Sequence, residues 1–166
     1  EAEDGTLSGV STATNLSGYS GNSYIDASTF TSSGDSIEVI ANVPSAGDYD
    51  IAIGYYNGAS GAKHNDLVIN NSATKDVYTP VSTSWQEVTI SDVALNAGNN
   101  SLRLEKEWGW VNFDYIKVVG AGSGTSGGGG TTGGGPASLE VRYATTLNNT
   151  MEVRIDNTLA ANARPD

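Results

Sequence analysis

The sequence predicts an all-β domain over residues 1–119, a two-layer β-sandwich or jelly roll. Three observations lead to this fold class. Short segments of alternating apolar and polar residues recur along this part of the chain, with the period of two that marks half-buried strands. Clusters of Gly, Asn, Pro and Ser separate these segments at the spacing of sandwich turns. No window carries a sustained helical period, so little helix is expected.

The first clear strands are expected at residues 37–43 and 49–55. In both segments apolar side chains occupy every second position, as in a strand with one buried face. A Pro-Ser-Ala-Gly turn interrupts the pattern between them. Tyr55 continues the apolar face of the second strand and is a core candidate, whereas Tyr56 points the opposite way.

Shorter alternations predict the remaining strands. Apolar residues two positions apart mark strands around residues 67–69, 88–90 and 102–104. Residues 113–119 form the last strand, because they are rich in the aromatic and β-branched side chains that suit a pleated surface. Asn and Gly between these segments favour turns. The turns are expected at residues 57–58, 70–72 and 96–99.

The chain changes character after residue 119. Residues 120–136 are almost entirely Gly, Ser and Thr, so a flexible linker to a neighbouring domain is expected. Residues 137–166 have the pattern of two strands joined by a turn. They are either the first piece of a second, related module, or expression-derived or chance β patterning. In both cases a lone hairpin is marginal in water, so we expect a disordered tail that does not dock on residues 1–119.

Composition excludes several classes of function. The net charge of −11 opposes binding to nucleic acid, which is itself a polyanion. The absence of Cys removes disulfides and thiolate-bound metals. No segment is long and apolar enough to predict a membrane span. The chain opens directly on Glu1-Ala2-Glu3, as a mature or excised module does. We therefore expect a secreted, monomeric protein.

The sequence offers no recognisable catalytic group. His64 is the single His, and no G-x-S-x-G motif marks a Ser nucleophile. One His without Cys cannot build a His-rich zinc site. The number of acidic residues, 19, does not by itself exclude the pair of catalytic carboxylates that a glycosidase uses. A glycosidase, however, needs a larger frame to hold substrate on both sides of the scissile bond, so we expect no catalytic residues.

Two tryptophans around one glycine are the most informative residues. Trp108 and Trp110 flank Gly109, and they share a face on a strand or form two walls of a cleft in a loop. One interpretation is that an indole closes the end of the sandwich. The other is a stacking platform for sugars, because the axial C–H face of a pyranose is weakly positive and the indole face is negative. Trp85, just before a predicted strand, is interpreted as core.

Polar and aromatic residues near the tryptophans match the needs of a sugar site. Asn112 carries an amide that both donates and accepts hydrogen bonds, as paired hydroxyls require. Tyr55, Tyr56 and Asn57 end another predicted strand and are candidates for a second wall. The following loop contains the remaining hydrogen-bonding candidates, Lys63 and His64.

Short motifs in a fixed order resemble carbohydrate-binding module family 35, and more distantly family 6, over residues 1–119. The motifs include Glu1-Ala2-Glu3, Gly54-Tyr55-Tyr56-Asn57-Gly58 and Trp110-Val111-Asn112-Phe113-Asp114-Tyr115-Ile116. The resemblance implies a jelly roll whose sugar site lies among the loops at one end. It implies ligand contacts from Trp110, Asn112 and one of Tyr55 or Tyr56. Trp108 is additional to the family pattern, and Gly54 stands where many relatives have a basic residue.

The resemblance also implies a structural calcium ion. Glu1 and Glu3 match the acidic pair at the family's N-terminus, and Asp114 matches its late-strand ligand. Carboxylates are the hard oxygen ligands that calcium prefers, and carbonyl groups of residues 21–24 would complete the shell. The alternative is that the two glutamates form a frayed, solvated terminus.

Members of this family bind β-mannans, uronic acids of xylan or pectin, or galactose-containing glycans. An acidic protein needs a local cation to hold a uronate, and only Lys63 and Lys106 stand near the predicted cleft, without an acidic cluster for a second calcium. We therefore expect a neutral β-mannan or decorated mannan as ligand. The module would target an appended glycoside hydrolase to plant cell walls. Uronic-acid recognition and protein–protein adhesion remain the alternatives.

Overall fold

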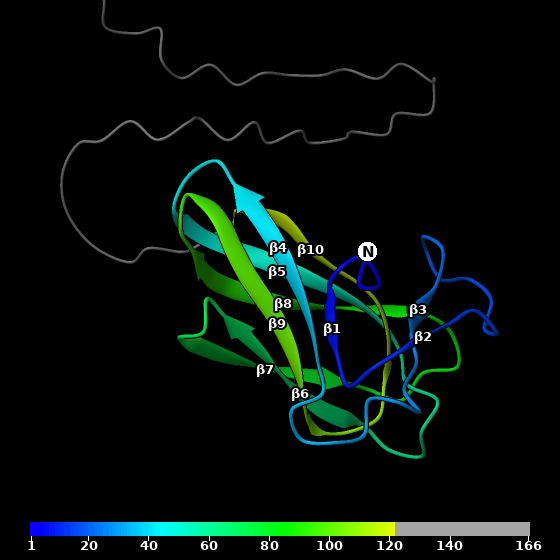
Figure 1. The fold of residues 1–166 in the computed structure, drawn as a ribbon. Helices are drawn as coiled ribbons and strands as arrows, with labels where there is room; N and C mark the ends of the chain where they lie inside the picture. Colours follow the sequence, from blue (N-terminus) through cyan, green and yellow to red (C-terminus); the bar gives the residue numbers. More distant parts are fainter. Residues whose placement is uncertain (122–166) are drawn as a thin grey trace, which may run out of the picture. The chain divides into compact units, whose positions relative to one another are not determined.

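A computed structural model describes residues 1–121, which form two stacked antiparallel sheets without a helix (Figure 1). Sheet A has the order β1-β4-β9-β6-β7, and sheet B has the order β2-β3-β10-β5-β8. The predicted all-β sandwich is confirmed. Residues 122–166, with most of the predicted linker and all of the predicted tail, lie outside the described residues. The strands are β1 (Thr6–Ser8), β2 (Thr12–Ala13), β3 (Tyr24–Ile25), β4 (Ser36–Val43), β5 (Gly47–Tyr56), β6 (Lys63–Ile69), β7 (Ala73–Thr79), β8 (Gln86–Leu95), β9 (Gly98–Trp108) and β10 (Asn112–Ala121).

The core lies between the two sheets, where the alternating residues of both inner faces meet. Ile37 of β4 and Leu104 of β9 are buried on sheet A, and Ile53 of β5 is buried on sheet B. Phe30 and Phe113 pack edge to face with ring centroids 5.7 Å apart. Burial of such side chains is the main favourable term in folding a domain of this size. Among residues 1–121, no helix is long and apolar enough to cross a bilayer.

Asn-rich turns set the register of the strands, as their composition predicts. Asn70 and Asn71 both adopt positive φ, 50° and 55°, as the central residues of a β-turn in which the Ser72 N–H donates to the Ile69 carbonyl at 3.0 Å. They join β6 to β7 in a regular ladder. The Asn100 amide closes the β8–β9 turn, accepting from the Asn96 N–H at 2.9 Å and donating to the Asn96 carbonyl at 2.8 Å.

The interpretation of Trp85 as core is wrong. Trp85 is half-buried and is not part of the core between the sheets. It packs instead against Tyr24 and Tyr56, with ring centroids 5.2 and 5.7 Å away. Its indole N–H donates to the Ser17 carbonyl at 3.1 Å. Trp85 therefore fastens the segment before β3 to the strand-end region of sheet B.

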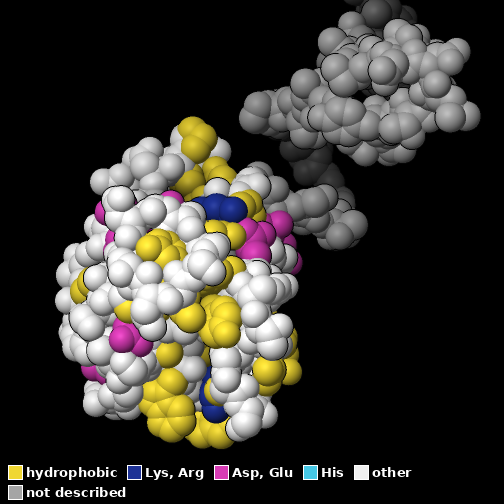
Figure 2. Space-filling model, turned by 90° about the vertical axis from the view of Figure 1, so that its right-hand side faces the viewer, with side chains coloured by type: hydrophobic (Ala, Val, Ile, Leu, Met, Phe, Trp, Pro, Cys, Tyr) yellow, Lys and Arg dark blue, Asp and Glu magenta, His cyan; other side chains and the backbone are white. Residues whose placement is uncertain are grey.

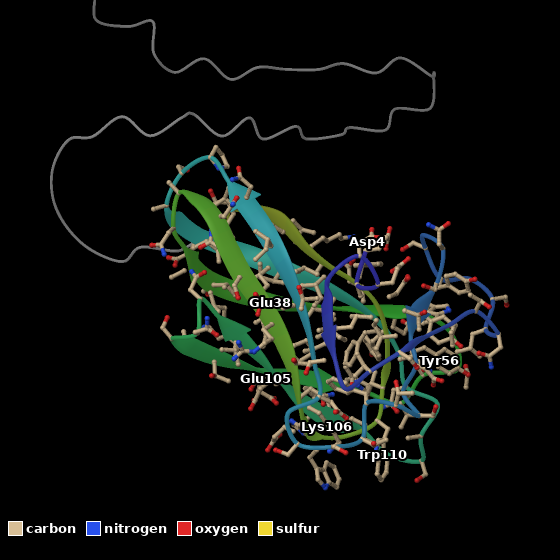
Figure 3. All side chains as sticks on the ribbon, in the orientation of Figure 1. Asp4, Glu38, Tyr56, Glu105, Lys106 and Trp110 are labelled. Atoms are coloured by element: carbon tan, nitrogen blue, oxygen red, sulfur yellow. The ribbon has the colours of Figure 1, made fainter. Side chains whose placement is uncertain are left out.

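A β-bulge near the end of β9 sets the direction of the tryptophan segment. His64 of β6 pairs with Trp108, whereas Asp66 pairs with Glu105, so β9 advances three residues while β6 advances two. An extra residue of this kind bends a strand and re-aims the side chains beyond it. Here it places Trp108 opposite His64. Lys106 and Trp110, which precede and follow Trp108 in the chain, are labelled at the lower end of the sandwich in Figure 3.

Candidate functional site

The two tryptophans of the Trp-Gly-Trp segment are open to solvent. Trp108 ends β9 and is 64% exposed, and Trp110 lies in the short connection to β10 and is 54% exposed. Figure 2 shows hydrophobic side chains gathered at this lower end of the molecule beside a Lys or Arg side chain. These exposures exclude the interpretation that either indole closes the end of the core. Exposed large aromatic side chains side by side are typical of binding surfaces.

The Lys63 side chain lies between the two indoles. Its Nζ is 5.0 Å from the ring centroid of Trp108 and 5.5 Å from that of Trp110, within range of cation–π attraction to both rings. Gly109 makes room for this chain, since a Cβ at position 109 would lie 2.5 Å from the Lys63 Cβ. Lys63 therefore holds the two rings in a fixed relation. No ion pair among residues 1–121 includes Lys63.

Asn112 begins β10 two residues after Trp110 and lies opposite Tyr56 of β5. The Tyr56 ring packs against Trp85. The Asn112 Oδ1 accepts a hydrogen bond from the Ala27 N–H at 2.8 Å, which fixes the orientation of the amide. Within residues 1–121 its NH₂ group donates to no protein acceptor. Two N–H donors are thus available to a ligand beside Trp110, two positions earlier in the chain.

The predictions for Asn57 and Tyr55 as ligand contacts are wrong, because both side chains are buried. The Asn57 amide is fully buried and donates to the carbonyls of Gly61 and Thr79 at 3.2 and 2.9 Å. Asn57 therefore stabilises the conformation of the β5–β6 loop from inside the domain. Tyr55 is 4% exposed and faces the core opposite Phe113, which was the alternative left open for it. Tyr56, half-exposed on the other face, is the tyrosine that remains for the site.

Lys63 and His64 are the first two residues of strand β6. The sequence-based prediction that they lie in the preceding loop is therefore wrong. The Nδ1 atom of His64 lies 2.8 Å from the Asp76 Oδ1. The His64 ring is 5.0 Å from the ring of Tyr78, which is 47% exposed. Sequence reasoning missed Tyr78. The available signal was its place between the inward-facing Val77 and Thr79, which puts Tyr78 on the outer face of β7.

The three carboxylates expected to bind calcium converge on one loop. Ser20 donates its N–H to both oxygens of Asp114 at 3.0 Å and its hydroxyl to Glu1 at 2.8 Å. Glu3 accepts from the N–H groups of Asn22 and Ser23 through Oε1. Its other oxygen is buried without a partner. The loop thus presents N–H groups where carbonyls were expected, and residues 1–121 contain no ready group of three acidic or His ligands at metal spacing.

Burial raises the pKa of the Asp114 carboxyl, and the charges of Glu1 and Glu3 raise it further, while the bonds from Ser20 act in the opposite direction. The loss of solvation is the largest of these effects. An ionised carboxylate at this position is therefore short of counter-charge. A bound cation would supply that charge.

A groove among the described residues lies away from the tryptophans. It has a volume of about 550 Å³ and is lined by residues of the N-terminal segment, β4 and β10, among them Asp4 and Glu38, which are labelled in Figure 3. It contains no aromatic side chain. A sugar ring gains most binding energy by stacking on a flat aromatic face, which this groove lacks. Trp108 and Trp110, arranged around Lys63, are therefore the better candidate site, and we call them the tryptophan platform.

Comparison with known proteins identifies one family and relatives with different named activities. The family model described as carbohydrate binding module (family 35) matches residues 1–120. Mannan endo-1,4-beta-mannosidase A of Piromyces sp. is 35% identical over 118 residues, which cover 71% of this chain and 19% of that protein. The Podospora anserina GH26-CBM35 beta-(1,4)-mannanase structure has a TM-score of 0.66 at 28% identity, covering 86% of this chain and 29% of that one. A Xyl-CBM35 in complex with a glucuronic acid-containing disaccharide has a TM-score of 0.61 at 28% identity, covering 70% and 88%.

Proposed function

Because the chain belongs to carbohydrate-binding module family 35, we propose that residues 1–121 bind a neutral plant cell-wall polysaccharide, a β-mannan or decorated mannan. The observation that carries this proposal is the pair of exposed indoles, Trp108 and Trp110, held around Lys63. Among the first relatives found, three are mannan endo-1,4-beta-mannosidases. This chain covers about a fifth of their length, so its matching part corresponds to one module of such enzymes.

Binding would follow from stacking and amide hydrogen bonds. When a hexose lies flat against an indole, both surfaces lose water, and the ring quadrupole attracts the C–H face of the sugar. The Asn112 amide, fixed by the Ala27 N–H, would donate to hydroxyls and select orientation. Exchange of water for protein at each hydroxyl gives little net gain, so a Kd on the order of micromolar to a hundred micromolar is expected.

In the full-length protein this module would target an appended glycoside hydrolase to its substrate outside the cell. A surface of exposed aromatic rings and amide donors would hold a polymer without cleaving it, so the enzyme would gain local substrate concentration. We infer a secreted, monomeric module with no catalytic residue of its own.

Affinity electrophoresis tests the proposal directly. The 166-residue chain would run through gels that contain mannan, galactomannan, glucuronoxylan or pectin. Retardation in the mannan gels, lost in Trp110→Ala, is the expected result. Ile40→Ala is a matched control, because Ile40 is also an exposed apolar side chain but lies on β4. Free migration in every gel would remove the glycan assignment and favour an adhesion surface.

Uronic-acid recognition is a second candidate that one observation favours. The Lys63 ammonium lies between both indoles and has no acidic partner within residues 1–121. A charged donor in that position suits the carboxylate of a uronate on the same platform. Lys63→Met separates the two readings, since it preserves much of the apolar stem. It would abolish retardation by glucuronoxylan or pectin if a uronate is the ligand. If the ligand is neutral, it would weaken retardation by mannan only in part, because the variant loses the ammonium contacts with both indoles but keeps the indoles themselves.

We also propose that Glu1, Glu3 and Asp114 hold a structural calcium ion. The buried, unpartnered Glu3 Oε2 and the shared loop of the three carboxylates support this site. Calcium would supply the counter-charge and tie the N-terminus to β10. A ligand that binds only the native state raises the melting midpoint. Calcium should therefore raise the midpoint of the wild-type chain and not that of Asp114→Asn. An equal midpoint with calcium and with chelator would contradict the site.

A further inference from the structure

Three ring side chains form a row across the outer face of sheet A. His64 on β6 pairs with Trp108 on β9 and with Tyr78 on β7. Directly paired residues point to the same face of a sheet, so the three rings lie side by side across neighbouring strands. We call Trp108, His64 and Tyr78 the ring row. Strand spacing makes its span roughly 10 Å between the outer two attachment points.

The ring row is exposed along its whole length. Trp108 is 64% exposed, Tyr78 is 47% exposed and the His64 side chain is 41% exposed. The His64 and Tyr78 rings are 5.0 Å apart and tilted by 51°. One end of the row is Trp108 itself. The row is therefore continuous with the platform described above, and it leads away from the loops onto the strands.

Carboxylates flank the ring row on the next line of paired residues. Asp66 is opposite Glu105 on one side and Asp76 on the other. Glu105 is bonded to Arg103 at 2.7 Å and Asp76 contacts His64 at 2.8 Å, which holds both carboxylates in place. Three acidic side chains in line accept hydrogen bonds from neutral hydroxyls and repel a second carboxylate. This flank favours an uncharged polymer along the row.

We propose that the ring row is an additional sugar subsite that binds the interior of a neutral, β-linked hexose chain running from Trp110 over Trp108 toward Tyr78. The inference rests on the proposed function and deepens it. The two tryptophans alone would contact only one or two sugar units, whereas the ring row would contact a longer stretch of the polysaccharide. Tyr78 is the residue that distinguishes the two cases. It lies at the far end of the row, in edge strand β7.

Titration calorimetry of the full chain with mannobiose and mannohexaose tests the subsite. The ring row predicts that wild type binds the hexaose more tightly than the biose. Tyr78→Ala should weaken hexaose binding by about 3- to 10-fold, the range of one aromatic contact, and change biose binding by less than a factor of about 2. Tyr78→Phe keeps the ring and should retain the wild-type affinity. Trp110→Ala should weaken both ligands.

The outcomes separate the subsite from the proposed function. Equal hexaose affinity in wild type and Tyr78→Ala, with Trp110→Ala impaired, would overturn the ring row and leave the glycan platform standing. No binding of either oligosaccharide by wild type would overturn both mannan recognition and the row. Equal loss in Tyr78→Ala and in the control Ile40→Ala would show a general effect of surface truncation and would also overturn the row. Circular dichroism of each variant excludes unfolding as the cause of a loss.

Discussion

Substitution of Gly109 by Ala would disturb the sugar platform without removing any of its rings. A Cβ at position 109 would lie 2.5 Å from the Cβ of Lys63, 2.7 Å from its Cγ and 2.6 Å from its Cδ. These atoms form the stem of the lysine near the backbone, so the clash cannot be relieved by turning the ammonium alone. Gly109 is buried, and overpacking of a buried position costs about 1–3 kcal/mol.

The same clash should lower affinity for the glycan. Displacement of Lys63 breaks its contacts with Trp108 and Trp110, each of which contributes about 0.5–1 kcal/mol at an exposed site. The two indoles would then lose their fixed relation and would have to be ordered when the glycan binds. Loss of both contacts corresponds to an increase in Kd of about 5- to 30-fold. Urea denaturation measures the first effect and titration calorimetry measures the second.

Gly61→Ala is the matched control, because a Cβ at position 61 meets no atom within 4 Å. It should leave stability and affinity close to wild type. In a double-mutant cycle with Lys63→Gly, which removes the three clashing atoms, Gly109→Ala should cost much less stability than it does in the wild-type background. If Gly109→Ala is as stable and binds as tightly as Gly61→Ala, the account of how Lys63 orders the platform is wrong.

Three further substitutions test other parts of the account. Asn57→Ala should lower the free energy of unfolding by about 1–3 kcal/mol, because the buried Thr79 carbonyl loses its donor; chemical denaturation checks this, and an unchanged midpoint would contradict the supporting role of Asn57. Asn112→Asp keeps an acceptor for the Ala27 N–H but removes both donors, so the melting midpoint should stay near wild type while glycan affinity falls; unchanged affinity in calorimetry would remove Asn112 from the site. Hydrogen bonds from Lys117 and then Tyr115 lower the pKa of the Glu87 carboxyl below its ordinary value of 4.5. A carboxyl group with a depressed pKa stabilises the fold at pH values above its unfolded pKa, and this stabilisation is lost as the pH falls through the folded pKa. As the pH is lowered through this range, the melting midpoint of Glu87→Gln should therefore fall less than that of wild type. An equal fall in both proteins would refute this.

The fold followed from alternation and turn chemistry because both are local properties. Ile51, Ile53 and Tyr55 occupy one face of β5 and are buried together, as a period of two requires. The turn at Asn70 and Asn71 was visible for the same reason, since positive φ favours Asn. Local pattern also separated Tyr55 from Tyr56, which face opposite sides of the same strand.

The errors arose where contacts between distant segments decide the role of a side chain. Asn57 looked like an exposed turn residue, but its amide bridges Thr79, 22 positions away. Trp85 looked apolar enough for the core, yet it is only half-buried and packs against Tyr24 and Tyr56, which are distant in the sequence. Neither partner is visible in a window around Trp85, so hydrophobicity alone placed it wrongly.

The bulge in β9 explains why the extent of the site was not predicted. Trp108 was identified by composition, but its position opposite His64 depends on one extra residue between Glu105 and Trp108. If β9 continued from Glu105 in regular register without the bulge, Trp108 would pair with Lys63 and its indole would turn to the other face. The row that ends at Tyr78 is therefore a consequence of register between strands, which single-sequence patterns do not reveal.

Two-dimensional NMR of the indole N–H groups tests the central claim most directly, because the chain has three tryptophans and Trp85 serves as an internal reference with its N–H bonded to Ser17. During titration with mannohexaose, the signals of Trp108 and Trp110 should move and saturate together, while that of Trp85 shifts far less. Stationary signals from both exposed indoles at saturating ligand, or a shift confined to Trp85, would contradict the platform.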